Sequence, residues 1–258
     1  MSEKKVVVVT GGGQGIGQAI AERLAADGFN VAINDINPKT AEAVCTALRD
    51  KGCDATLAMG DVSKRDQVHA MVDKVLEHYG RLDVMVANAG VIKIATMMDT
   101  TEEDLDFMHS INVKGMLWCA QAAAKAMIAQ GGGKIIAASS TCGHTGTVPL
   151  MGAYSGTKFS VRGLTQALAA ELAPHGITVN AYCPGVVETS MWEESEKAIS
   201  AITGAAKGEP LQAIVEQIPL GRHQQPSDVA NLVSFLASSD ADYITGQALM
   251  ANGGGYMV

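Results

Sequence analysis

A tyrosine and a lysine in the middle of this sequence have the types and spacing needed for proton transfer. They begin and end the pentad Tyr154-Ser155-Gly156-Thr157-Lys158. If the pentad is helical, the phenol and the ammonium lie on one face, about one turn apart. A nearby ammonium favours the phenolate, so we expect it to lower the pKa of Tyr154 from its free value of about 10. Such a tyrosine can exchange a proton with a carbonyl or alcohol oxygen.

A glycine-rich segment near the N-terminus has the composition of a dinucleotide-binding turn. The run TGGGQGIG at residues 10–17 separates a short apolar run from a helical pattern. Its spacing, G-x-x-x-G-x-G, differs from the common G-x-G-x-x-G fingerprint. A turn without a ligand is the alternative, but five glycines in seven residues carry an entropic cost that indicates a purpose. We therefore expect the helix amides to meet a pyrophosphate here. The residues assigned to this contact are Gly11, Gln14, Gly15, Ile16 and Gly17.

Asp35 follows the second apolar run, residues 30–33, and stands 18 positions after Gly17. A carboxylate at this place can accept the ribose hydroxyls of an adenosine and repels a 2′-phosphate. Neither Gln14 nor Ile36 supplies a cation that would attract that phosphate. The sequence therefore predicts NAD(H) rather than NADP(H), with Ile36 beside the adenosine. A solvated loop acid is the alternative for Asp35.

Residues that follow two later apolar runs complete the expected cofactor site. Asp61 and Val62 could hold the adenine, through one carboxylate contact and one apolar contact. Asn88, Ala89 and Gly90 provide a small, polar strand end near the ribose. Because open α/β sheets bind ligands at the carboxyl ends of their strands, we expect these segments to converge.

Strand and helix patterns alternate along the whole chain. Strands that are apolar throughout and separated by helices indicate a parallel sheet covered on both faces, so we expect one α/β domain, residues 1–258. The polar segment 188–219 breaks the alternation and contains short helical patches, and we interpret it as a substrate lid. The expected strands are 5–9, 30–33, 56–59, 83–87, 134–139, 178–183 and 248–250. The expected helices begin after residue 17 and continue with 39–51, 66–79, 101–130, 153–173 and 227–238.

Composition excludes several classes of function. The 258 residues carry a net charge of −8 without a block of like charges, which argues against nucleic acid or an anionic membrane as a partner. Five scattered cysteines, none in C-x-x-C spacing, indicate reduced thiols and no metal site. The apolar run 6–9 is too short for a signal peptide or a membrane span, so we expect a cytoplasmic protein.

With these residues assembled, the sequence resembles the short-chain dehydrogenase/reductase family over nearly its whole length. The resemblance implies a single-domain, Rossmann-type doubly wound parallel sheet with about seven strands and helices on both faces. It also implies a homotetramer and a catalytic tetrad. The matching residues are 10–17, Asp61, 88–90, Asn112, Ser140, Tyr154, Lys158 and Pro184-Gly185.

The tetrad implied by this resemblance consists of Asn112, Ser140, Tyr154 and Lys158. Tyr154 is implied to be the general acid in carbonyl reduction and the base in alcohol oxidation. Lys158 is implied to lower its pKa and to hydrogen-bond the nicotinamide ribose. Ser140 is implied to orient the substrate oxygen and stabilise its developing charge. Asn112 is implied to hold a water that links Lys158 to solvent.

One departure from the family pattern concerns the serine. The fourteen residues from Ser140 to Tyr154 are one more than the family's usual interval. Ser139 would lengthen the interval further, whereas Thr141 would fit it with a threonine. We prefer Ser140 because Ser140-x-x-Gly143 keeps the local pattern.

The resemblance also places the segment after Pro184-Gly185 beside the nicotinamide. Val187 and Thr189 are expected to meet the carboxamide, and Met191 is assigned to the cofactor as well. Trp192, next in the chain, either closes an apolar wall over a small substrate or packs the lid on the core. His144 and Met151 could line the substrate pocket, although a lone histidine near a site is more often a wall residue than an acid or base.

Within the family, several segments resemble NAD-dependent acetoin reductases, also called meso-2,3-butanediol dehydrogenases. These segments are 27–29, 112–115, 158–166, 182–185 and 191–192. We therefore expect hydride transfer between NAD(H) and a small hydroxyketone or diol, with acetoin and 2,3-butanediol as the best candidates and diacetyl reduction possible. A sorbitol- or galactitol-type polyol dehydrogenase is the nearest alternative. A 3-oxoacyl carrier-protein reductase fits less well, because Asp35 and the acidic charge oppose NADP(H) and an acidic carrier. An inactive scaffolding member is disfavoured by the complete tetrad.

Overall fold

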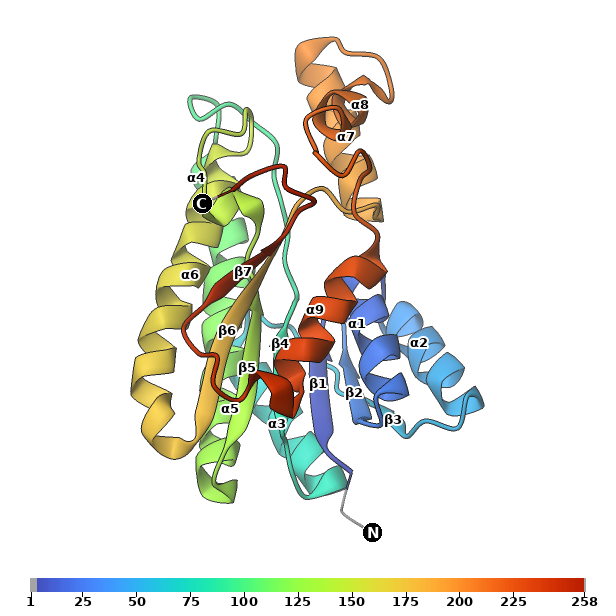
Figure 1. The fold of residues 1–258 in the computed structure, drawn as a ribbon, viewed down its shortest axis with the longest axis vertical. Coiled ribbons are helices and arrows are strands. Elements are labelled where there is room, and N and C mark those ends of the chain that lie inside the picture. Colours follow the sequence, from blue (N-terminus) through green and yellow to red (C-terminus); the bar gives the residue numbers. More distant parts are fainter. Residues whose placement is uncertain (1–3, 258) are drawn as a thin grey trace.

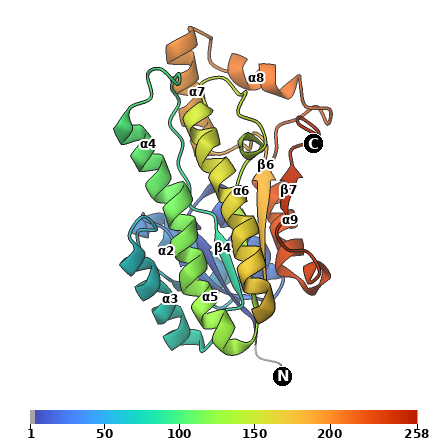
Figure 2. The same cartoon turned by 90° about the vertical axis from the view of Figure 1, so that its left-hand side faces the viewer.

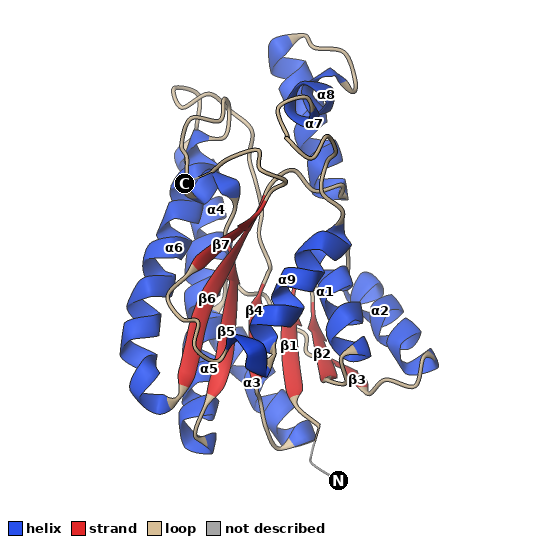
Figure 3. Ribbon diagram, in the orientation of Figure 1, coloured by secondary structure: helices blue, strands red, loops and turns tan. Residues whose placement is uncertain are grey.

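The computed structural model describes residues 4–257 and has a fully parallel, seven-stranded sheet at its centre (Figures 1 and 3). The strands are β1 Val6–Thr10, β2 Asn30–Asn34, β3 Ala55–Leu57, β4 Val84–Ala87, β5 Gly133–Ala138, β6 Ile177–Pro184 and β7 Ala248–Ala251. Their order in the sheet is β3-β2-β1-β4-β5-β6-β7. The inner strands are apolar on both faces, as in β1, where every residue is buried.

Helices cover both faces of this sheet. The α-helices are α1 Gly15–Ala26, α2 Pro38–Asp50, α3 Arg65–Tyr79, α4 Glu102–Met108, α5 Met116–Gln130, α6 Gly152–Leu172, α7 Ser190–Thr203, α8 Glu209–Val215 and α9 Pro226–Ala237. The π-helical segment is η1 His109–Gly115, and the short 3-10 turns are η2 Thr141–Gly143, η3 Ala173–His175 and η4 Ser239–Ala241. One core packs α3, α5 and α6 against the sheet, and a second packs α1, α2 and α9 against its other face (Figures 1 and 2).

The order of strands reverses beside β1, which pairs with β2 on one side and β4 on the other. Such a reversal opens a crevice at the carboxyl ends of the strands, where α/β sheets usually bind ligands. Thr10 is in register with Asn34, and Val9 is in register with Val86. The chain segments that leave β1, β2 and β4 therefore meet at one edge.

The expected fold class is confirmed, and each of the seven expected strands is present within a few residues of its predicted bounds. One helical region differs from expectation. The single helix expected over 101–130 consists of α4, the π-helical segment η1 and α5 in direct succession. Apolar periodicity does not reveal this change, because a π segment widens the helix locally without ending it.

The segment 188–219 is more helical than the short patches we expected. It contains α7, with 14 residues, and the shorter α8. Gly204 ends α7 in the left-handed conformation, with φ of 77°. Both helices project beyond the carboxyl edge of the sheet (Figure 1). Among the residues described, none of the helices combines the length and the apolarity that crossing a bilayer requires.

Candidate functional site

The glycine turn between β1 and α1 is shaped by close packing. Gly11 adopts a positive φ of 62°, and a Cβ at Gly17 would overlap the carbonyl oxygen of Gly11. The absence of a side chain at Gly17 therefore lets α1 approach β1. Gln14 precedes α1 without a side-chain cap, and the first turn of α1 contains no acidic residue. The amides at this helix N-terminus are therefore suited to an anionic group such as a pyrophosphate.

Asp35 is held directly beside this turn, just after the end of β2. Its Oδ2 accepts a hydrogen bond from the Gly13 amide at 2.9 Å, and its Oδ1 accepts one from the Asn37 amide at 3.0 Å. A Cβ at Gly13 would lie 2.8 Å from the same Oδ2. The neighbouring Ile36 is 75 % exposed and leaves an apolar side chain free at this edge. The carboxylate thus has a fixed position where an adenosine ribose would lie.

The segments after β3 and β4 reach the same edge. Asn88 donates through Nδ2 to the carbonyl oxygens of Thr10 and Gly11, at 2.8 and 3.2 Å. The Thr10 hydroxyl accepts from the amides of Asn88 and Ala89, at 3.0 and 3.1 Å. Asp61 accepts from its own turn, and Val62 is buried. Asn88 and Ala89 therefore contact the glycine turn directly, as the order of strands requires.

Tyr154 and Lys158 lie on one face of α6, as the spacing predicted, and Ser140 joins them from the end of β5. Ser140 is placed to lower the pKa of the Tyr154 phenol by hydrogen bonding. The Lys158 Nζ atom lies 5.5 Å from the centroid of the Tyr154 ring and donates to the Ala138 carbonyl oxygen at 2.8 Å. A Cβ at Gly90 would lie 3.4 Å from that Nζ. The absence of a side chain at Gly90 therefore leaves room beside the ammonium.

The three hydroxyl residues at the end of β5 have different partners. Ser139 donates to the Lys158 carbonyl oxygen at 3.0 Å, and Thr141 donates to the Pro184 carbonyl oxygen at 3.1 Å. Ser140 accepts from the Cys142 amide at 3.1 Å and is the one of the three that influences the pKa of Tyr154. The catalytic role of Ser140 stays a prediction.

Asn112 lies in the π-helical segment η1, and its side chain is buried. Its Oδ1 accepts from the Val91 amide at 2.8 Å. Its Nδ2 donates to the Val91 carbonyl oxygen at 2.9 Å and to the Thr157 hydroxyl at 3.0 Å. Both amide hydrogens are thus used inside the protein, and they join the segment after β4 to the pentad on α6. A water held by this residue stays a prediction.

A hydrogen bond and close packing at a glycine hold the Ser140 loop against α6. Arg162, one turn beyond Lys158, donates to the Gly143 carbonyl oxygen at 2.7 Å. A Cβ at Gly143 would overlap the Ser139 hydroxyl, so a larger residue there would push the loop away from the helix. Sequence reasoning did not find Arg162, because its role depends on a contact between segments 19 residues apart.

Burial decides the protonation of Tyr154 and Lys158. It raises the pKa of the Tyr154 phenol, while the hydrogen bond from Ser140 lowers it to a smaller extent. It also lowers the pKa of Lys158 to about 8. We expected Lys158 to lower the pKa of Tyr154 below its ordinary value, and that expectation is wrong for the protein itself. The cost of placing a charged phenolate in a fully buried site outweighs the stabilisation from Ser140, and Lys158 is not among the groups that lower this pKa.

The segment after Pro184-Gly185 leads from β6 to the start of α7. Val187 is buried in the core, and Thr189 precedes α7. A Cβ at Gly15 would lie 3.3 Å from the Thr189 methyl group, so Thr189 lies against the glycine turn. Met191 is half-exposed, and the buried Nε1 of Trp192 has no hydrogen-bond partner among the residues described.

The other two residues assigned to the substrate lie near the start of α6. Met151 is buried directly before α6. His144 is partly buried, which lowers the pKa of its imidazole, and its Nε2 has no hydrogen-bond partner among the residues described. Contacts of either residue with a substrate stay predictions.

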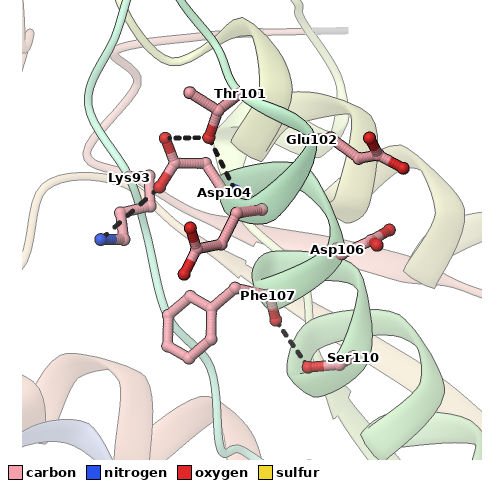
Figure 4. Close-up of a pocket in the computed structure, with 8 residues that line it drawn as sticks. Lys93, Thr101, Glu102, Asp104, Asp106, Phe107 and Ser110 are labelled. Atoms are coloured by element: carbon pink, nitrogen blue, oxygen red, sulfur yellow. Dashed lines mark hydrogen bonds and ion pairs between the residues drawn. The ribbon is translucent and has the colours of Figure 1, made fainter.

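A surface hollow of about 950 Å³ lies on α4, away from the residues described above (Figure 4). Acidic side chains and Phe107 line it, and Lys93 pairs with Asp104 at 3.6 Å on its rim. No residue of the glycine turn or of the pentad contributes to it. The hollow is therefore not part of the candidate active site.

Comparison with known proteins agrees with this geometry. A family model described as enoyl-(acyl carrier protein) reductase matches residues 11–256. A diacetyl reductase, (S)-acetoin forming, of Staphylococcus epidermidis is 46 % identical, and the match covers 97 % of this chain and 98 % of that protein. The chain belongs to the short-chain dehydrogenase/reductase family. An L-2,3-butanediol dehydrogenase of Corynebacterium glutamicum is 45 % identical, with the same shares covered.

A solved structure shows the same fold. A gluconate 5-dehydrogenase of Burkholderia cenocepacia, in complex with NADP and tartrate, superimposes with a TM-score of 0.89. It is 33 % identical, over 97 % of this chain and 94 % of that one. As a member of this family, the protein is an enzyme of the dehydrogenase and reductase class.

The shifted pKa of Lys158 makes part of the stability depend on pH. Below pH 8 the folded protein carries the buried ammonium at its full desolvation cost. Between pH 8 and about 10.5 the folded protein has lost this proton while the unfolded chain keeps it, so the contribution of Lys158 to stability rises with pH. In urea unfolding at pH 7, Lys158→Met should therefore have a higher free energy of unfolding than the parent. At pH 10 this difference in the free energy of unfolding should be smaller by on the order of 2 kcal/mol.

Lys197→Met, at an exposed position of α7, is the control and should show no such change between the two pH values. A gain for Lys158→Met that stays the same at pH 7 and pH 10 would contradict the lowered pKa.

Proposed function

We propose that the protein is an NAD(H)-dependent oxidoreductase that interconverts a small ketone and its secondary alcohol, with acetoin and 2,3-butanediol as the preferred pair and diacetyl as a further substrate. The observation that carries the reaction type is the convergence of Ser140, Tyr154 and Lys158 at the sheet edge that holds the glycine turn. The relatives named for diacetyl reduction and butanediol oxidation support the choice of substrate.

The chain's own groups carry the proton chemistry. Tyr154 gives its phenolic proton to the carbonyl oxygen during reduction and takes it back during oxidation. Ser140 donates to the same oxygen and stabilises its developing charge. A bound nicotinamide supplies or accepts the hydride at the carbon. Lys158 would hydrogen-bond the nicotinamide ribose. In its protonated form, Lys158 would also stabilise the Tyr154 phenolate electrostatically. Asn112 donates to the Thr157 hydroxyl and thereby holds the turn of α6 that carries Tyr154 and Lys158.

The glycine turn, Asp35 and the segments after β3 and β4 form the proposed cofactor site. The uncapped N-terminus of α1 would hold the pyrophosphate, and Asp35 would accept the adenosine ribose hydroxyls. A 2′-phosphate would meet this carboxylate at close range. We therefore propose NAD(H), although the gluconate 5-dehydrogenase of the same fold was solved with NADP.

The segment 188–219 is the proposed substrate lid of a single domain. Its two ends are joined, because the Glu188 amide donates to the Gln224 carbonyl oxygen and the Gln224 amide donates to that of Val186, both at 2.9 Å. The Glu188 carboxylate also contacts His223 at 2.9 Å. With its base fixed in this way, the lid can move over the site as a unit while Trp192 contributes an apolar wall.

A substrate panel tests this function. The panel contains acetoin, diacetyl, the isomers of 2,3-butanediol, sorbitol and galactitol, each assayed with NAD(H) and with NADP(H). We expect kcat/KM for a four-carbon hydroxyketone or diol to exceed that for either sugar alcohol by at least about tenfold, because a missing favourable contact in a pocket costs 1–3 kcal/mol. The highest rates with a sugar alcohol would instead establish the polyol alternative.

Replacing Tyr154 by Phe tests the chemical step. Loss of the transferable proton should reduce kcat at least about a hundredfold, with little change in NADH binding. Tyr243→Phe removes the same hydroxyl from a fully exposed position and serves as the matched control. Carbonyl reduction at the parent rate by Tyr154→Phe would exclude the mechanism.

Replacing Asp35 by Ser tests the cofactor. Without the carboxylate, a 2′-phosphate is no longer repelled and the ribose loses an acceptor. We expect KM for NADPH to fall and KM for NADH to rise, each by about tenfold. Asp50→Ser, at the far end of α2, should change neither value. An unchanged ratio of the two KM values would show that Asp35 does not select the cofactor.

We also propose a homotetramer. Support comes from four large apolar side chains of α4, α5 and α6 that are 40–43 % exposed. These three helices lie on the side of the molecule that faces the viewer in Figure 2. The four side chains are Leu105, Phe107, Ile128 and Phe159. Light scattering should give four times the 26.8 kDa of one chain, and Ile128→Glu should shift the distribution to smaller species. A monomeric mass for the parent would contradict this proposal.

A further inference from the structure

Tyr182 is a buried tyrosine in β6 that none of the assignments above includes. It is 1 % exposed and lies in the core between the sheet and the helices α1 and α9. Its neighbours in register are Ala138 on β5 and Leu249 on β7. A buried phenol in such surroundings needs a hydrogen-bond partner for its hydroxyl.

That partner comes from two strands away. The Tyr182 hydroxyl donates to Asn88 Oδ1 at 2.8 Å. β5 lies between β6 and β4, so the ring reaches across it to the residue that follows β4. Asn88 in turn uses its Nδ2 group to bind the carbonyl oxygens of Thr10 and Gly11. The phenol is therefore connected through one amide to the glycine turn.

This connection sets the orientation of the Asn88 amide. The two carbonyl oxygens of the turn can only accept, so they require the Nδ2 side of the amide. Tyr182 can donate, and so it satisfies the opposite side. Without the phenol, Oδ1 would lack this donor and the amide would be held from one side alone. The carbonyl of Gly11, at a positive φ, would then be less firmly placed.

We propose that Tyr182 is a positioning residue for the cofactor, which acts through Asn88 on the glycine turn. This inference rests on the proposed nicotinamide-dependent function. It concerns cofactor affinity, whereas Tyr154, Ser140 and Lys158 act at the carbonyl. Tyr182 therefore affects binding of the dinucleotide and leaves the proton-transfer step largely unchanged.

The experiment is a fluorescence titration of the full-length protein with NADH in the absence of any carbonyl compound. Tyr182→Phe removes only the hydroxyl and keeps the ring in the core. We expect Kd for NADH to rise about three- to tenfold, the value of one buried hydrogen bond. At saturating NADH, kcat for the best substrate of the panel should stay within about twofold of the parent.

Tyr79→Phe is the matched control. The Tyr79 hydroxyl donates to Asp54 Oδ1 at 3.1 Å, at the end of α3 and away from the glycine turn. Its removal should lower thermal stability slightly and leave Kd for NADH unchanged. A double-mutant cycle adds a second readout. In an Asn88→Ala background, Tyr182→Phe should have no further effect on Kd, because the connecting amide is already absent.

The outcomes separate this inference from the proposed function. If the parent binds NADH but Tyr182→Phe binds it equally well, the positioning role is wrong while the function stands. The same holds if Tyr79→Phe weakens binding as much, since the effect would then be general loosening. If the parent binds neither NADH nor NADPH, both proposals fail. Tyr182→Phe could raise Kd for NADH even if no carbonyl compound of the panel is reduced. That result would support the positioning role and reject only the proposed substrate.

Discussion

The close contact of β1 and β4 at their carboxyl ends is the constraint on which the site depends. There the Thr10 hydroxyl accepts from two amides after β4 and donates to the Val86 carbonyl oxygen, while Asn88 binds the turn in return. These polar groups are largely removed from water, and each would be costly if left unpaired. The two chain segments can therefore separate only at the expense of several hydrogen bonds at once, which keeps the proposed cofactor crevice in one shape.

Burial of charge is the second physical constraint on the site, and it acts at Lys158 on α6. Lys158 is buried, and its backbone and side chain both contact the end of β5. A group in such surroundings responds strongly to any charge that comes near it, since little water is present to screen the interaction. In the proposed mechanism, a substrate oxygen would thus meet groups whose positions are already fixed.

Much of this arrangement was predictable from the sequence, and the remainder depended on contacts that spacing does not report. Local sequence patterns predict the strands and the glycine turn. They also predict that Tyr154 and Lys158 share one helix face. The π-helical turn around Asn112, the partner of Ser139 and the reach of Arg162 and Tyr182 do not, because each is set by packing between distant segments. The predicted direction of the Tyr154 pKa shift was wrong for a related reason. Spacing shows which charges are near a group but not how much water surrounds it.

The hydrogen bonds that hold the site together come from segments outside 188–219, which has a consequence for how such a protein can diversify. Arg162 and Ser139 join the Ser140 loop to α6, whereas Asn88 and Thr10 join the glycine turn to β4. In the segment 188–219, Thr189 lies against the glycine turn, whereas α7 and α8 project beyond the sheet (Figure 1). A different version of the proposed lid beyond Thr189 could therefore arise during evolution without breaking these hydrogen bonds. One scaffold can in this way keep its redox chemistry constant while its range of substrates changes.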